Sequence, residues 1–160
     1  MGIFFGEDVQ IDGEHTYHGG GFINWEGAAS PGTGGDADWH EATGCTAADD
    51  LDDVTHSDCD LTATNATHYE INYSFSFIGH TNETYRSAIS IGTPADLVPE
   101  MAIGCQDFVK ILTGTNGGDL GGQCSANIPA GATVRVIIMS VGAGVTEMTV
   151  KTFDFHIHQV

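Results

Sequence analysis

The chain has 160 residues, and 41% of them are hydrophobic, which suffices for one domain with a real core. It carries 22 acidic residues against four Lys and Arg, a formal net charge of −18. Charge of this sign excludes nucleic acid as a partner and disfavours anionic membranes, because both require positive charge. No apolar run is long enough for a transmembrane helix, so we expect no membrane insertion.

The first part of the chain is expected to form short strands followed by a long loop. Three β-like segments, 9–11, 15–18 and 22–25, are separated by glycine-containing turns. Residues 26–66 are rich in Gly and Asp and poor in apolar side chains, so we expect a long irregular acidic loop there. Its acid-rich run 49–53 lacks the spacing of an EF-hand, and we interpret it as a solvated loop that could hold hydrated cations.

Alternation of apolar and polar residues begins near residue 68. Between Tyr69 and Phe77 it predicts a half-buried strand with an aromatic inner face. The run 133–141 is apolar on both faces and is expected to be a central strand. A bulge is expected near Lys151 and Thr152, where the apolar residues change from even to odd positions. The remaining expected elements are strands at 84–91, 108–112 and 146–160, a loop at 114–122 and a turn at 126–132.

Strands that recur about every ten residues, separated by turn residues, are typical of sandwiches and jelly rolls. We therefore predict an all-β fold, an antiparallel β-sandwich of jelly-roll type. The whole chain, 1–160, is expected to form a single domain, with 26–66 as an insertion.

Four cysteines, Cys45, Cys59, Cys105 and Cys124, follow no CxxC zinc or redox pattern. Two local disulfides, Cys45–Cys59 and Cys105–Cys124, would each close a short loop and stabilise the fold. The alternative is four buried free thiols. We favour the disulfides.

His156 and His158 are two apart on an expected strand, so both side chains project from one face. Such an HxH pair is a weak metal candidate, because no third ligand can be named and the Glu that follows it in cupins is absent. We expect no metal here and interpret the pair as a polar strand face or a seam between subunits. No phosphate-binding loop or GxSxG motif occurs, so we expect neither catalysis nor a cofactor.

The strands expected at 69–77 and 85–91, the turn 128–131 and the terminal strand 153–160 resemble TNF/C1q-like jelly-roll domains of tailed-virus structural proteins. The resemblance implies a homotrimer in which aromatic side chains of one sheet surround the threefold axis. The residues that this predicts for the oligomer interface are Tyr69, Tyr73, Phe75, Phe77, Phe153, Phe155 and Ile157.

The function that this resemblance implies is that of a trimeric capsid decoration protein. It would be made in the host cytoplasm and bind the major capsid protein or another virion protein at the virion surface. The apolar residues Ile3, Phe4 and Phe5 would form the first strand of the domain, an arm that contacts the capsid, or both. One alternative is the receptor-binding tip of a tail or head fibre, with Trp25 and Trp39 in the receptor loop. A free carbohydrate-binding module is another. The acidic, lysine-poor composition resembles proteins of salt-loving archaea or their viruses.

Overall fold

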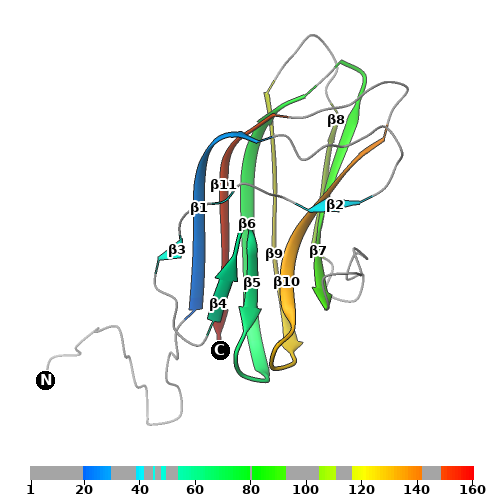
Figure 1. Ribbon diagram of the computed structural model, residues 1–160. Helices are drawn as coiled ribbons and strands as arrows, with labels where there is room; N and C mark the ends of the chain where they lie inside the picture. Colours follow the sequence, from blue (N-terminus) through cyan, green and yellow to red (C-terminus); the bar gives the residue numbers. More distant parts are fainter. Residues whose placement is uncertain are drawn as a thin grey trace, which may run out of the picture.

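Two antiparallel sheets pack face to face in the computed structural model (Figure 1). Sheet I has the strand order β3-β1-β11-β6-β9, and sheet II the order β4-β5-β10-β7-β8, with β2 also paired to β10. The structure describes residues 20–29, 39–41, 45, 48–49, 54–79, 81–92, 105–110, 117–141 and 149–160.

The strands of sheet I are β1 (Gly20–Ala29), β3 (Ala48–Asp49), β6 (Thr67–Ile78), β9 (Gly117–Ile128) and β11 (Thr149–Gln159). Those of sheet II are β2 (His40–Glu41), β4 (Val54–Ser57), β5 (Asp60–Ala63), β7 (Thr84–Gly92), β8 (Gln106–Lys110) and β10 (Thr133–Val141). The prediction of an all-β antiparallel sandwich is confirmed. Within the described residues, no helix has the length and apolar character needed to cross a membrane.

The core lies between the sheets and follows the alternation of the sequence. Along β6 the odd-numbered side chains from Tyr69 to Phe77 are buried, while the even-numbered ones face outward. Phe77 meets Tyr85 of sheet II edge to face, with 4.9 Å between ring centroids. Burial of these large rings, together with the aliphatic residues packed around them, holds the sheets together.

The expected positions of β10 and of the bulge in β11 are both confirmed. β10 lies between β5 and β7, and every residue from Thr133 to Met139 is buried. The pairing of β11 with β6 shifts register between Val150 and Thr152, so Lys151 is the extra residue. The bulge keeps the apolar side chains on one face although their parity in the sequence changes.

Two predicted loops contain strands. Inside 26–66 the structure describes β2 to β5, whose apolar residues are too few to give a clear alternation. Residues 50–53 of the acid-rich run, and the segments 9–11 and 15–18, lie outside the described residues. The expected loop 114–122 is wrong from Gly117 onward, because β9 begins there.

Glycine in β9 reflects a close approach of the strands. A Cβ on Gly121 would lie 2.8 Å from the carbonyl oxygen of Tyr73, and one on Gly122 would lie 2.8 Å from the Tyr73 ring. Glycine normally disfavours a strand, but here any side chain would push β9 away from β6. The glycines therefore fit this strand for steric reasons.

We predict that Gly121→Ala lowers the free energy of unfolding by roughly 1–3 kcal/mol, because the added methyl group collides with backbone that cannot rotate away. Gly117→Ala is the matched control, since its Cβ would lie 3.4 Å from the Phe77 carbonyl oxygen. Urea unfolding of both variants measures the difference. Equal stability of the two variants would contradict this explanation of the glycines.

Candidate functional site

The seven residues predicted for the oligomer interface lie in the core of the protomer, so that prediction is wrong. Their side chains are enclosed between the sheets and are at most 4% exposed. Tyr73 shows why they cannot face another copy: its hydroxyl reaches across the sandwich to the Ser87 hydroxyl, 2.9 Å away. Burial raises the pKa of Tyr73 to about 12. The corrected residues are Tyr69, Tyr73, Phe75, Phe77, Phe153, Phe155 and Ile157.

The opposite side of sheet I, called here the polar face, carries short polar and charged side chains. One rung across it consists of Asp154, Ser74 and Gly121, which are paired in register. At another rung, His68 Nδ1 lies 3.2 Å from Asn127 Oδ1. The described residues of the polar face are His68, Glu70, Asn72, Ser74, Ser76, Asp119, Gly121, Gln123, Ser125, Asn127, Thr152, Asp154, His156 and His158, and the exposed Ile78 lies beside Gly117 at one end of the face.

His156 and His158 lie on the polar face, as their spacing predicts. Their rings stack with centroids 4.8 Å apart, and His158 Nε2 lies 3.1 Å from Glu70 Oε2. Partial burial and the neighbouring His158 lower the pKa of His156, while Glu70 opposes the shift. The arrangement is that of a polar strand face with one histidine-carboxylate contact.

The structure joins the cysteines in the two pairs that the sequence favours. Cys45–Cys59 and Cys105–Cys124 have Cα–Cα distances of 4.9 and 5.4 Å. Asp58 accepts a 2.8 Å hydrogen bond from the Cys45 amide. Among the described residues, Cys45, Asp58 and Cys59 form the group with metal-ligand spacing, but sulfurs joined in a disulfide are not thiolate ligands.

A buried ion cluster, which the sequence analysis missed, lies on the outer side of β10. Arg135 is 1% exposed, and its Nε lies 2.7 Å from Glu41 Oε1 and 2.9 Å from Asp60 Oδ2. Nε and Nη1 of Arg135 have no hydrogen-bond partner by strict geometry, so the two contacts of Nε are ion pairs. The cluster joins β2, β5 and β10, and its only sequence signal is a charge within an apolar run.

Burial is the largest influence on Asp60 and raises its pKa to about 6, with Arg135 opposing the shift and Glu41 reinforcing it. The carboxyl group therefore titrates well above its ordinary value of 3.8. A buried arginine between two carboxylates that come from different strands can hold those strands together. We interpret the cluster as structural.

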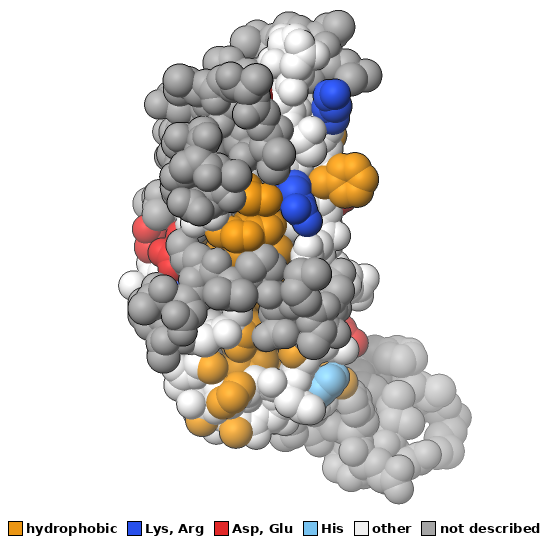
Figure 2. Space-filling model, turned by 90° about the vertical axis from the view of Figure 1, so that its right-hand side faces the viewer, with side chains coloured by type: hydrophobic (Ala, Val, Ile, Leu, Met, Phe, Trp, Pro, Cys, Tyr) orange, Lys and Arg blue, Asp and Glu red, His pale blue; other side chains and the backbone are white. Residues whose placement is uncertain are grey.

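An aromatic and cationic patch lies on the outer side of sheet II. Phe108 is 72% exposed and pairs across the strands with Arg86, whose guanidinium carbon lies 5.8 Å from the centroid of the Trp39 ring. Lys110 follows two residues later on the same side of β8. Figure 2 shows a face of the molecule on which a hydrophobic side chain projects beside basic side chains. Of the predicted receptor residues, Trp39 lies here, whereas the side chain of Trp25 is outside the described residues.

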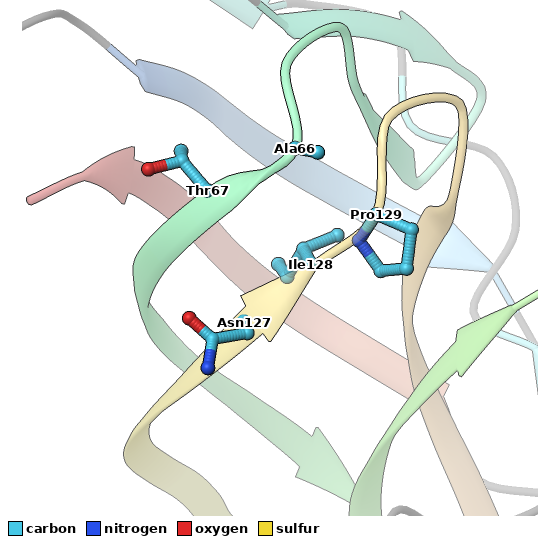
Figure 3. A pocket seen from close by; sticks show the side chains of 5 residues that line it. All are labelled: Ala66, Thr67, Asn127, Ile128 and Pro129. Carbon is cyan, nitrogen blue, oxygen red and sulfur yellow. The ribbon is translucent and has the colours of Figure 1, made fainter.

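A pocket of about 340 Å³ lies where β6 begins and β9 ends (Figure 3). Its lining residues are Ala66, Thr67, Asn127, Ile128 and Pro129, and Ile128 lies near the middle of the group. None of these five residues titrates or acts as a nucleophile at neutral pH. The pocket therefore offers no catalytic chemistry. The predicted capsid contact, Ile3, Phe4 and Phe5, lies outside the described residues.

Solved structures with the same architecture cover nearly the whole chain. The globular domain of zebrafish complement 1qA protein has a TM-score of 0.62 at 10% identity, over 89% of this chain and 97% of that one. Murine APRIL at pH 5.0 has a TM-score of 0.60 at 9% identity, over 89% and 99%. The fold is a TNF/C1q-like jelly roll.

Eiger TNF from S. frugiperda is similar as well, with a TM-score of 0.55 at 9% identity over 90% of this chain and 89% of that one. No protein-family model matches the chain, and no curated protein matches it. The TNF/C1q-like assignment therefore concerns the fold, and the function has to be argued from the surfaces.

We predict that Arg135→Met destabilises the protein by about 3 kcal/mol or more, because it leaves Glu41 and Asp60 close together without a counter-charge. The triple variant that adds Glu41→Gln and Asp60→Asn should recover most of this loss. Chemical denaturation of both variants measures the effect. If the triple variant were as unstable as the single one, packing rather than charge would be the reason.

We predict that lowering the pH from about 7 to about 5 raises the melting temperature of the wild type more than that of Asp60→Asn. The folded pKa of about 6 lies above the ordinary 3.8, so the folded chain takes up this proton first. Protonation of Asp60 therefore increases the free energy of unfolding as the pH falls below about 6, and this contribution is lost when the pH rises above that value. Thermal scans at several pH values measure it, and parallel pH curves for both proteins would contradict the assignment.

Proposed function

We propose that the protein is a homotrimeric structural component of a virus particle, a capsid decoration protein that acts by assembly and binding and not by catalysis. The polar face of sheet I is the observation that carries the proposal. The resemblance to TNF/C1q-like domains of viral structural proteins implies that one sheet surrounds a threefold axis with aromatic side chains, but in this chain those side chains fill the core of the protomer. We therefore assign the subunit seam to the polar face in place of the aromatic side. The partner would be the major capsid protein or another protein of the virion surface.

Charge supports a salt-adapted assembly. Three protomers of −18 would carry three times −18, or −54, and such chains repel one another in dilute salt. At about 1 M salt the Debye length falls to about 3 Å, so this repulsion is largely screened. Hydrogen bonds between short polar side chains on the polar face can then hold the subunits together. These properties fit a virus of a salt-loving archaeon.

We predict that the purified protein is a trimer at about 3 M NaCl and dissociates toward monomers at about 0.1 M, as screening is lost. Light scattering coupled to size-exclusion chromatography measures the mass in each condition. A monomer at about 3 M would contradict the trimer. A trimer that is unchanged at about 0.1 M would contradict the adaptation to salt.

A receptor-binding fibre tip is the second candidate, and the half-exposed Trp39 beside Arg86 favours it. Aromatic and arginine side chains that stand together on a surface are typical of binding hot spots. The position of the chain in the particle separates the two functions. Cryo-electron microscopy that finds copies spread over the shell supports decoration, whereas copies confined to fibre ends support the tip.

A further inference from the structure

Phe108 is exposed to a degree that its own protomer does not explain. Among the described residues, the other exposed large hydrophobic side chains are Val160 at 43% and Ile78 at 39%, against 72% for Phe108. Phe108 also lies on β8, the last strand of sheet II, with a neighbour in that sheet on one side. A phenylalanine at the end of a sheet is a natural anchor for another protein.

The charges around Phe108 indicate the chemistry of its partner. Arg86 and Lys110 are two of only four Lys and Arg residues in the chain, and both lie on the same side of sheet II as Phe108. Arg135 is buried in its ion cluster, and Lys151 lies at the bulge of β11 in sheet I. The patch is therefore a local concentration of positive charge on a protein of net charge −18, and it suits an acidic partner surface.

A second copy of the chain offers such a surface. On the polar face, the rung of Asp154, Ser74 and Gly121 places a carboxylate beside two residues with little or no side chain. Ser74 is exposed, so an aromatic ring can lie flat over this part of the sheet. A guanidinium held next to that ring would then reach the Asp154 carboxylate.

We propose that Arg86 and Phe108 of one copy dock on the Asp154–Ser74–Gly121 rung of the next copy. The two surfaces differ, so each copy uses one of each, and a closed ring results if the rotation between copies is one-third of a turn. The inference rests on the proposed trimer and adds the residues that join its subunits. It also explains how a chain with so few cations can contact a copy of itself.

The test compares Phe108→Ser and Arg86→Gln with Val160→Ser, a control that removes another exposed apolar side chain. Each is measured by sedimentation at about 3 M NaCl, where repulsion is screened. Phe108→Ser and Arg86→Gln are expected to weaken association at least about tenfold, and Val160→Ser to leave it unchanged. Melting curves verify that every variant is folded.

A photo-reactive benzoylphenylalanine at position 108 maps the partner directly. Cross-links to β6 or β11 of another copy, identified by mass spectrometry, would support the proposal. Cross-links to any other segment would overturn it, as would association of Phe108→Ser equal to that of Val160→Ser. If the wild type itself is monomeric, the proposed trimer fails together with this interface, whereas an unaffected variant trimer removes the interface alone.

Discussion

Arg135 places a buried guanidinium on the outer side of the central strand β10, between Glu41 of β2 and Asp60 of β5. Without these partners the buried charge would be very costly, so β2 and β5 have to lie where they do. β2 follows directly after Trp39, whose ring contacts Arg86. By holding β2 in place, the ion cluster also positions Trp39 within the aromatic and cationic patch.

The sequence predicted the alternation of β6 and the bulge of β11 because both depend on local spacing. It did not reveal which face of sheet I is enclosed in the core of the protomer. Alternation shows that a strand has two unlike faces, but it does not distinguish a face that packs against the other sheet from a face that packs against another subunit. In this chain the large aromatic residues fill the core. The space between the two sheets has to be filled at high packing density, so large apolar side chains are used for the core before they are used for a contact with a partner.

The other errors have a common origin in contacts that are distant along the chain. Gly121 and Gly122 are turn residues by local preference, and only the proximity of Tyr73 explains them within a strand. The acids of the ion cluster, Glu41 and Asp60, lie far from Arg135 in the sequence and are hidden among many other acids. In a chain with so many acidic residues, the positions of the few Lys and Arg residues are more useful than those of the acids for predicting ion pairs.

The Cys105–Cys124 disulfide makes the rigidity of one border of the sandwich depend on the redox state of the protein. It links the start of β8 to β9, and so ties the last strand of one sheet to the last strand of the other. Where a disulfide is reduced its sulfurs are thiols, and the two last strands would then be held by weaker contacts such as the 3.1 Å hydrogen bond from the Gly121 amide to Asp107. Closing the Cys105–Cys124 bond therefore stiffens the border next to Phe108, and reducing it would loosen the same border.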